Sequence, residues 1–458
     1  MRVVVVGGGI AGLAAALRLR DELGAAARIT VLDQAGRLGG KLRTEAFGDG
    51  YSEAGAEAFV VTDPAAVELA GRVGLGDALR HPATGRAALA IAGELVPIPA
   101  GTLMGVPADP AAVAGVAEVG AQADPDGGRP LLGPGQDVAV GALVRARLGG
   151  AVLDRLVDPL LGGVYAGRGD DLSLAATVPA LAAACRTEST LTGAVRAALA
   201  RRASTPGPVF ATIDGGVGRL VDAVAAATDA QIRLGAPVRS LERVGGAGRV
   251  VGAWRVGGAW RVDGLDADAV VLAIPARPAA RLLAGISPDA AVEVGVLDYA
   301  SVALVTFAVR GARLPDLSGF LVPASEGYAV KALTIFSTKW AHQARPGGLA
   351  VLRASVGRYG ETAVLHRSDD DLAALVHDEL GRLLGAPLPV PEAVRVTRWG
   401  GALPQYAPGH LDRVARARAA LADVPGLALA GAAYDGVGIP ACVRSGWAAA
   451  ERLLGSDT

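Results

Sequence analysis

The chain opens with a short apolar run, a glycine turn, a longer apolar stretch and a second apolar run. Residues 2–6 (RVVVV) predict a buried strand, residues 10–23 predict a helix, and residues 28–33 (RITVLD) predict a second strand. Glycines at positions 7–9 supply the turn between the first strand and the helix. A strand–helix–strand unit of this kind predicts a parallel, doubly wound sheet.

Similar patterns recur far along the chain, separated by material of different texture. Residues 208–225 and 427–454 each predict a strand, a glycine turn and a helix. Between 71 and 204, Ala-rich helical stretches alternate with Gly/Pro breaks. Further strands are expected at 231–244, 249–256, 259–263, 267–276, 300–309, 349–356 and 395–399, and a helix at 369–384. This order predicts a nucleotide-binding domain that another domain interrupts.

One local feature is a near-repeat, VGAWRV at 251–256 followed by GGAWRV at 257–262. The simplest interpretation is a local duplication that lengthens a hairpin. No function is assigned to it.

Composition narrows the class of protein. The 458 residues are enough for two or three domains, and 51% of them are hydrophobic against 19% charged. The net charge of −1 gives no sign of a nucleic-acid-binding surface. The two cysteines, Cys185 and Cys442, form neither a metal-ligand spacing nor a disulfide framework, which fits a cytoplasmic protein. The apolar run 3–17 is short for a membrane span, and a signal peptide remains an alternative for it.

The first motif that carries chemistry is Gly7-x-Gly9-x-x-Gly12. Gly7 allows a tight turn, Gly9 lets the backbone approach a pyrophosphate, and Gly12 lets the helix pack closely on the strand. The helix N-terminus then offers N–H groups to phosphates. Asp33 ends the next strand, 21 residues after Gly12, where a carboxylate accepts hydrogen bonds from ribose hydroxyls.

The residues after Asp33 favour FAD over NAD. Arg37, Gly39, Gly40 and Lys41 follow in quick succession. Arg37 can neutralise a pyrophosphate, and the two glycines let backbone amides meet a bulky group. An NAD site has no need of this second loop.

With these motifs the chain resembles the FAD-dependent amine oxidase and protoporphyrinogen oxidase superfamily, which has an R-x-G-G-[KR] element after the ribose carboxylate. Gly55-Ala56-Glu57 resembles its flavin-adjacent loop, and Val238 lies where its adenine-contacting valine lies. VVLAIP (270–275) resembles its strand beneath the cofactor. Gly431, followed by Val437-Gly438-Ile439 and a helix, matches its C-terminal element. The resemblance implies a helix N-terminus directed at the flavin, which would stabilise the anionic reduced form.

Within the superfamily, the chain resembles the bacterial, Gram-positive-type, oxygen-dependent porphyrinogen oxidases of haem synthesis. The resembling segments are 81–107, 158–181, 398–410 and 432–446, in the same order as in that family. The family usually has Glu where Asp33 stands, so the carboxylate is kept but reaches less far. The resemblance implies six-electron oxidation of a porphyrinogen in three hydride transfers to flavin N5, with O2 as the acceptor that yields H2O2.

The site residues follow from the motifs and the resemblance. No catalytic side chain and no metal are expected, because the hydride goes to the flavin. Substrate-binding residues are expected to be Arg86, Tyr165 and Gly167. The cofactor, FAD held non-covalently, is expected to contact Gly7, Gly9, Ile10, Ala11, Gly12, Asp33, Gln34, Arg37, Gly39, Gly40, Lys41, Gly55, Ala56, Glu57, Val238, Trp399, Gly431, Val437, Gly438 and Ile439.

The substrate residues have simpler interpretations beside the functional one. Gly162, Gly163, Tyr165 and Gly167 would permit close approach of a planar ring, but a loop that only needs positive φ would look the same. Arg86 is the chosen partner of a propionate, since guanidinium binds carboxylates well. Only three of the 44 basic residues are lysines, so Arg86 is one of 41 arginines and an ordinary surface position remains open.

The expected fold class is mixed α/β: a discontinuous Rossmann-like FAD-binding domain with an inserted substrate-binding sheet domain and a helical domain. The FAD-binding parts are placed at 1–70, 205–285 and 395–458. The helical and substrate-binding region is placed at 71–204, and its second part at 286–394.

Two other functions stay open: an amine oxidase with an aromatic cage from Trp399, Tyr406 and Tyr434, and a catalytically idle flavin-bound scaffold. Among porphyrinogens, coproporphyrinogen III is preferred over protoporphyrinogen IX. The reason is that residues 98–128, part of the family's membrane-contacting region, contain no Lys, Arg or aromatic residue. They carry Asp109, Glu118, Asp124 and Asp126, which anionic lipids would repel, so at most weak peripheral membrane contact is expected. Transient contact with the next haem-pathway enzyme is expected as well.

Overall fold

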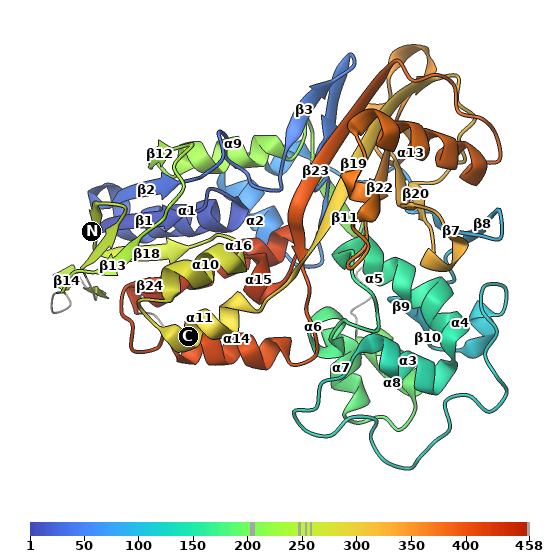
Figure 1. The fold of residues 1–458 in the computed structure, drawn as a ribbon, viewed down its shortest axis with the longest axis horizontal. Coiled ribbons are helices and arrows are strands. Elements are labelled where there is room, and N and C mark those ends of the chain that lie inside the picture. Colours follow the sequence, from blue (N-terminus) through green and yellow to red (C-terminus); the bar gives the residue numbers. More distant parts are fainter. Residues whose placement is uncertain (202–206, 246–248, 252–253, 257–258, 456–458) are drawn as a thin grey trace. The chain divides into compact units, whose positions relative to one another are not determined.

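The computed structural model describes residues 1–201, 207–245, 249–251, 254–256 and 259–455, and the chain divides into two compact units. Unit 1 comprises 1–81, 208–298 and 411–458, and unit 2 comprises 82–207 and 299–410. Each unit is therefore assembled from stretches that lie far apart in the sequence (Figure 1).

A parallel five-stranded sheet forms the centre of unit 1. In spatial order its strands are β12 (Gln231–Arg233), β2 (Arg28–Leu32), β1 (Arg2–Val6), β18 (Ala269–Leu272) and β24 (Leu427–Leu429). Val4 of β1 lies opposite Thr30 of β2 on one side and Val270 of β18 on the other. All four valines of β1 are buried, as expected for a strand covered on both faces. The predicted parallel, doubly wound opening is confirmed.

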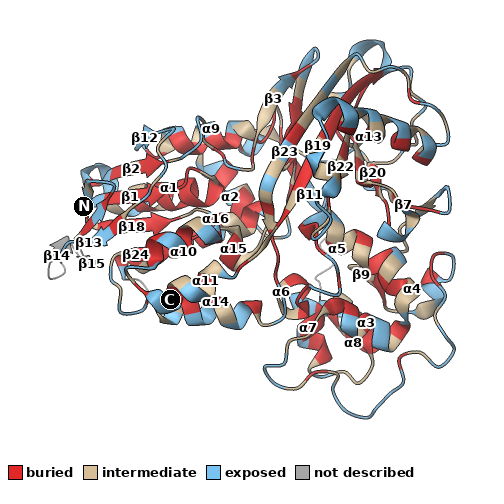
Figure 2. Ribbon diagram, viewed as in Figure 1, coloured by how far each residue is buried: buried red, intermediate tan, exposed pale blue. Residues whose placement is uncertain are grey.

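Helices cover this sheet, and α1 and α16 lie closest to each other. The helices of unit 1 are α1 (Ile10–Leu23), α2 (Ala65–Arg72), α9 (Gly218–Ala227), α10 (Ala276–Leu283), α11 (Pro288–Gly295), α14 (His410–Ala419), α15 (Ala432–Asp435) and α16 (Ile439–Leu454). A Cβ added at Gly446 of α16 would overlap the carbonyl oxygen of Ala11 in α1. Small residues at this crossing bring the first and last parts of the chain together. Figure 2 shows buried residues along β1, β18 and α1.

Shorter strands complete unit 1. They are β3 (Thr44–Phe47), β4 (Gly50–Glu53), β5 (Phe59–Val60), β6 (Leu79–Arg80), β11 (Phe210–Ile213), β13 (Leu241–Arg243), β14 (Arg249–Val251), β15 (Trp254–Val256), β16 (Trp260–Val262) and β17 (Leu265–Ala267). The single strand expected at 231–244 is wrong: Gly235, with φ of 64°, and Pro237 separate β12 from β13. Residues 252–253 and 257–258 of the near-repeat lie outside the described residues. Its two copies fall in different ribbons, β14–β15 and β13–β16–β17.

Unit 2 is built on a mixed seven-stranded sheet. In spatial order its strands are β23 (Ala393–Pro404), β19 (Tyr299–Arg310), β22 (Leu349–Val356), β21 (Val330–Ile335), β20 (Gly319–Leu321), β7 (Ala87–Ile91) and β8 (Glu94–Pro97). Only the β20–β7 pair is parallel. Helix α13 (Asp369–Leu383) buries Leu372, Val376 and Leu380 against this sheet, and Ser368 caps its N-terminus by accepting from the N–H of Asp371.

The helical part of unit 2 follows the β8 hairpin. Its helices are α3 (Val140–Leu148), α4 (Gly150–Val152), α5 (Asp158–Tyr165), α6 (Leu174–Thr177), α7 (Pro179–Cys185) and α8 (Leu191–Arg201), with α12 (Phe336–Lys339) later in the chain. A π turn at Leu153–Val157 leads into α5. Two short strands, β9 (Thr102–Leu103) and β10 (Val106–Pro107), precede this group.

The unit boundaries differ from the expected ones. Residues 395–410, expected with the FAD-binding parts, belong to unit 2, because β23 continues to Pro404 and pairs with β19 along its length. Residues 286–298 belong to unit 1, where α11 packs on α10. A strand partner distant in sequence sets the first limit, and the helix that directly precedes α11 in the chain sets the second.

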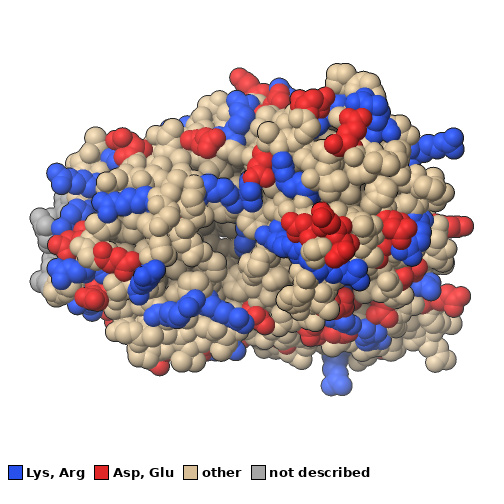
Figure 3. Space-filling model, turned by 45° about the horizontal axis from the view of Figure 1, so that its top comes forward, with Lys and Arg blue, Asp and Glu red and all other residues tan. Residues whose placement is uncertain are grey.

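Charge is evenly spread over the face drawn in Figure 3, where acidic and basic side chains lie interspersed. Among the described residues, no helix combines the length and the apolar character needed to cross a membrane.

Candidate functional site

The turn between β1 and α1 gives its three motif glycines three different surroundings. Gly7 has φ of 107°, and a Cβ there would overlap the carbonyl oxygen of Ala273. A Cβ at Gly12 would overlap the carbonyl oxygen of Gly7. A Cβ at Gly9, which caps α1, would meet nothing within 4 Å. The fold therefore requires glycine at 7 and 12, whereas Gly9 faces open space at a helix N-terminus.

Asp33 and the second glycine loop lie directly against this turn. One carboxylate oxygen of Asp33 accepts from the N–H of Gly8 at 2.7 Å, and the other accepts from the N–H of Ala35 at 2.8 Å. The N–H of Gly39 donates to the carbonyl oxygen of Gly8 at 2.8 Å. A Cβ at Gly40 would come within 3.3 Å of the Cα of Gly9. The two loops thus form one continuous backbone surface around the open space at Gly9.

Arg37 has a structural task that the sequence did not reveal. Its guanidinium donates to the carbonyl oxygens of Leu38 and Gly40 at 2.9 and 2.6 Å, and to that of Leu42 at 3.3 Å. Burial lowers the pKa of Arg37 from its ordinary value. These three contacts fix the shape of the second loop, and a direct contact of Arg37 with a pyrophosphate stays a prediction.

The loop that contains Gly55, Ala56 and Glu57 is joined to the second loop through Lys41. The N–H of Ala56 donates to the carbonyl oxygen of Lys41 at 3.0 Å, and Thr212 Oγ1 donates to that of Glu57 at 2.7 Å. Burial lowers the pKa of Lys41. The structure thus brings three sequence-predicted segments to one place in unit 1.

The C-terminal element is held by a polar network that sequence reasoning missed. Gly431 has φ of 121°, and its N–H donates to Ser445 Oγ at 2.8 Å. Ser445 Oγ donates to the carboxylate of Asp435, which also accepts two hydrogen bonds from Arg418, at 2.7 and 2.8 Å. The network fixes the loop that leads to Gly438, the N-cap of α16. Its members are too far apart in sequence to form a motif.

The remaining predicted cofactor residues belong to unit 1, except Trp399, which belongs to unit 2. Val238 is half-buried. It lies five residues after Arg233, whose carbonyl oxygen accepts a hydrogen bond from the N–H of Asp33 at 3.0 Å. Trp399 lies in β23 opposite Val302, so it belongs to unit 2, whereas the other predicted cofactor residues belong to unit 1. Ile10, Ala11, Val437 and Ile439 lie at or next to the N-termini of α1 and α16, and Gln34 is exposed beside Asp33.

This arrangement fits FAD by its own chemistry. The first-turn N–H groups of α1 have no acceptor within the helix and adjoin the open space at Gly9, where phosphate oxygens would be stabilised. Each carboxylate oxygen of Asp33 accepts one amide hydrogen bond, which leaves lone pairs for ribose hydroxyls. Among the described residues, no group of three or more His, Cys, Asp or Glu side chains could hold a metal ion.

Unit 2 contains the predicted substrate residues Tyr165 and Gly167, which close neighbours hold in place. Tyr165 is buried, which raises its pKa to about 12, and its ring lies edge-on to Tyr406 with centroids 5.7 Å apart. A Cβ at Gly167 would overlap Gln405 Oε1. The glycines of this loop have ordinary φ, and the positive φ of 51° falls on Ala166. The alternative that these glycines serve positive φ is therefore wrong.

Arg86 is exposed and already paired. Its side chain is 64% accessible and its guanidinium forms an ion pair with Asp316, a residue near the start of β20. A substrate carboxylate would therefore meet a guanidinium that Asp316 already pairs. The propionate role of Arg86 stays a prediction.

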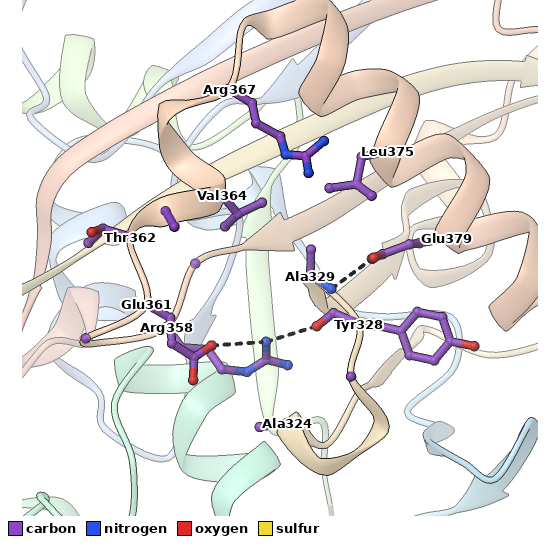
Figure 4. A pocket seen from close by; sticks show the side chains of 14 residues that line it. Ala324, Tyr328, Ala329, Arg358, Glu361, Thr362, Val364, Arg367, Leu375 and Glu379 are labelled. Atoms are coloured by element: carbon purple, nitrogen blue, oxygen red, sulfur yellow. Dashed lines mark hydrogen bonds and ion pairs between the residues drawn. The ribbon is translucent and has the colours of Figure 1, made fainter.

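A pocket of about 730 Å³ opens on unit 2 beside α13 and the loop after β22 (Figure 4). Arg358 lines the pocket, and its guanidinium donates to the carbonyl oxygen of Tyr328 at 3.2 Å. A carboxylate oxygen of Glu361 lies 4.0 Å from the same guanidinium nitrogen. Glu379 accepts from the N–H groups of Ala329 and Val330. Arg86, Tyr165 and Gly167 are not among the described residues that line it, so this pocket is not the site that the sequence predicted.

Lys331 is a buried cation that sequence reasoning did not select. It is 6% exposed and is the only lysine or arginine in the buried class among the described residues. Its Nζ donates to the carbonyl oxygen of Gly162 in α5 at 3.3 Å. Burial, together with the charge of Arg358, lowers its pKa to about 7. The sequence contains one signal for this role: Lys331 is one of only three lysines in the chain, and it lies within the apolar run AVKALTIF (329–336).

Lys331→Met is expected to stabilise the protein, most strongly in acid. The folded pKa of about 7 lies below the unfolded value of about 10.4, so the unfolded state binds more protons between these two values. The cost of burying the charge is therefore complete below pH 7 and fades as pH rises toward 10. At about 1.4 kcal/mol per pH unit, the gain below pH 7 is on the order of 3–5 kcal/mol.

Urea unfolding of wild type and Lys331→Met at pH 6 and pH 9 measures this effect. Lys339→Met, a half-buried lysine on α12, is the matched control and is expected to show no comparable gain. A stability gain that is equal at both pH values would contradict the buried-charge explanation.

Comparison with known proteins places the chain among flavoproteins. The family described as flavin containing amine oxidoreductase matches residues 10–454. The coproporphyrinogen III oxidase of Mycobacterium tuberculosis is 40% identical over 445 residues, which cover 96% of this chain and 94% of that protein. The coproporphyrinogen III oxidase of Bacillus subtilis is 31% identical over 477 residues, which cover 99% and 97% respectively.

A solved structure agrees with these relatives. A protein from Exiguobacterium, provisionally named a protoporphyrinogen oxidase, superposes with a TM-score of 0.85 at 32% sequence identity and covers 100% of this chain and 99% of its own. The expected mixed α/β fold with a Rossmann-like nucleotide-binding part is confirmed. The family match spans nearly the whole described chain, and this chain belongs to the flavin containing amine oxidoreductase family.

Proposed function

We propose that this chain is an FAD-dependent oxidase that converts coproporphyrinogen III to coproporphyrin III in haem synthesis. The observation that carries the proposal is 40% identity over 96% of the chain to a protein named coproporphyrinogen III oxidase. The open space at Gly9, next to the two hydrogen-bonded glycine loops, supports FAD as the cofactor. An amine oxidase remains the alternative within the same fold, and the near full-length identity to coproporphyrinogen III oxidases weighs against it.

In this proposal the residues of unit 1 hold FAD and set its orientation. The N-terminus of α1 would hold the pyrophosphate, Asp33 would hold a ribose, and the N-terminus of α16 at Gly438 would stabilise charge on the flavin. When bound, FAD supplies the hydride acceptor at N5, and O2 is the final electron acceptor. The positive end of α16 stabilises negative charge on the ring.

Unit 2 supplies substrate binding and no acid–base residue. Tyr165 and Gly167 are proposed to line the substrate cavity, with Arg86 as a propionate partner. Protons leave the pyrrole nitrogens and bridges of the porphyrinogen as it becomes aromatic, so the protein needs to bind, orient and exclude water. A cytoplasmic location and transient contact with the next enzyme of the pathway are part of the proposal.

FAD is expected to be bound without a covalent link. Cys442 lies in the first turn of α16 and its thiol contacts the carbonyl oxygen of Gly436, but burial raises its pKa to about 11, so the thiol is a poor nucleophile. Acid or heat denaturation, followed by removal of the precipitated chain, should leave the yellow colour in solution. Colour that stays with the denatured chain would refute the non-covalent claim.

The preference for coproporphyrinogen III rests in part on the segment 98–128. Asp109, Glu118 and Asp126 are exposed there and would repel anionic lipids. The expectation that Asp124 is a further surface acid is wrong. It is 8% exposed, and its carboxylate accepts from the N–H groups of Leu191 and Thr192 at the start of α8. Three exposed acidic residues therefore remain on this segment to repel anionic lipids.

The test is kcat/KM for coproporphyrinogen III and protoporphyrinogen IX on one preparation, with and without anionic liposomes. The proposal predicts a higher value for coproporphyrinogen III and little activation by liposomes. A clear preference for protoporphyrinogen IX, or strong activation by liposomes, would overturn the substrate assignment. Peroxide release with polyamines but not with porphyrinogens would favour an amine oxidase.

A further inference from the structure

Lys331 lies at an irregular point of β21, in the interior of the sheet of unit 2. Val330 pairs with Val356 of β22 and Ala332 pairs with Ser355, so Lys331 is the extra residue of a β-bulge. Bulges turn a side chain away from the regular alternation of a strand. The neighbours Val330 and Leu333 are buried apolar residues, and Lys331 shares their burial at 6% exposure.

The ammonium group of Lys331 has little within the protein to stabilise it. Its ammonium donates to the carbonyl oxygen of Gly162, which also accepts from the N–H of Ala166 at 2.9 Å. Among the described residues Lys331 forms no ion pair with a carboxylate. An ammonium carries three donors, and a buried charge is normally paired. Lys331 thus has donors to spare and no counter-ion.

The charged groups near Lys331 do not supply that counter-ion. Arg358, from the loop after β22, lowers the pKa of Lys331, because its positive charge disfavours a second positive charge nearby. The acidic groups of this region instead raise the pKa of Arg358, whose positive charge they stabilise: Glu361, Glu379 of α13 and Asp158 of α5. Arg168 adds a further positive charge there and lies 3.6 Å from Glu361. The surroundings of Lys331 therefore favour an incoming anion.

The position of Lys331 indicates which anion it would meet. Gly162, which accepts its hydrogen bond, belongs to the same short segment as Tyr165 and Gly167, the residues proposed to line the substrate cavity. Coproporphyrinogen III has four carboxylates, whereas protoporphyrinogen IX has vinyl groups in place of two of them. A vinyl group offers no charge to an ammonium, and a site built to pair a polar group rejects an analogue that lacks it.

We propose that Lys331 binds one of the carboxylates that coproporphyrinogen III has and protoporphyrinogen IX lacks, and that it thereby sets the preference for the four-carboxylate substrate. This inference rests on the porphyrinogen oxidase function proposed above. Lys331 is then a specificity-determining residue that contacts the substrate away from the reacting carbon.

The test compares kcat/KM for both porphyrinogens in wild type, Lys331→Met, Lys331→Arg and the control Lys339→Met, each at equal FAD content. Lys331→Met should lower the value for coproporphyrinogen III by roughly tenfold or more, and leave that for protoporphyrinogen IX unchanged or raised. Lys331→Arg should keep most of the preference, because it keeps the charge. Equal losses for both substrates in Lys331→Met would overturn the inference. A wild type that oxidises neither porphyrinogen would overturn the proposed function, and this inference with it.

The pH dependence separates carboxylate binding from a proton-accepting role. The preference of wild type should fall as pH rises through about 7, where free Lys331 loses its charge while substrate carboxylates stay ionised. The preference of Lys331→Met and of Lys331→Arg should not change over this range. A wild-type rate that instead rises through pH 7, and that Lys331→Arg fails to support, would show that Lys331 accepts a proton and would overturn carboxylate binding.

Discussion

Gly9→Val is expected to abolish FAD binding while leaving the fold intact. A Cβ at Gly9 meets nothing within 4 Å, so a side chain there begins in open space. The same space, at the N-terminus of α1, is where the pyrophosphate is proposed to lie, and a valine would occupy it. The purified variant should carry less than about a tenth of the wild-type FAD, measured by absorbance after denaturation.

A matched control separates this effect from general damage. Gly285 also has open space around a built Cβ, at an exposed turn of unit 1. Gly285→Val should therefore keep its FAD. Far-UV circular dichroism should be the same for both variants. A folded Gly9→Val protein with normal FAD content would refute the assignment of this turn to the pyrophosphate.

Gly446→Val is expected to destabilise the protein and to lower its affinity for FAD together. A side chain there would overlap the backbone of α1 at Ala11, and backbone cannot rotate away. Helices α1 and α16 would have to separate, which would displace both helix N-termini from the proposed FAD site. We expect a loss of about 3 kcal/mol or more in the free energy of unfolding.

Ala448→Val provides the comparison on the same helix. Ala448 is exposed, so a valine there places the same side chain on the same helix without a clash. Thermal unfolding and FAD titration of the two variants should show a large effect at 446 and a small one at 448. Equal behaviour of the two variants would mean that the close crossing of α1 and α16 does not support the cofactor site.

The local patterns of the sequence were sufficient to predict the opening of the fold. β1, α1 and β2 lie where the apolar runs predicted them, and the three glycines of the first motif have the surroundings that their roles require. The three elements follow from apolar patterns within windows of about 11–18 residues, whereas the carbonyl oxygen that requires glycine at position 7 belongs to the distant Ala273. Spacing alone therefore carries enough information for such elements.

Features that depend on residues distant in the sequence could not be predicted from local patterns. Residues 395–410 joined unit 2 because β19 offers an edge to β23. Asp124 is a buried cap rather than a surface acid, because the start of α8 lies next to it. Arg37 binds three carbonyl oxygens of a loop whose shape could not be known from spacing. Lys331 is distinguished as a substrate-binding residue by its burial, which the sequence does not reveal.

Oxidation of coproporphyrinogen III with FAD as the electron acceptor is the reaction proposed for this chain. The decisive experiment mixes the FAD-containing protein with coproporphyrinogen III under anaerobic conditions and follows the visible flavin absorbance. We expect the absorbance to bleach while coproporphyrin III forms, and to return when air is admitted. Flavin that stays oxidised with this substrate, yet bleaches with dithionite, would rule out the proposed reaction.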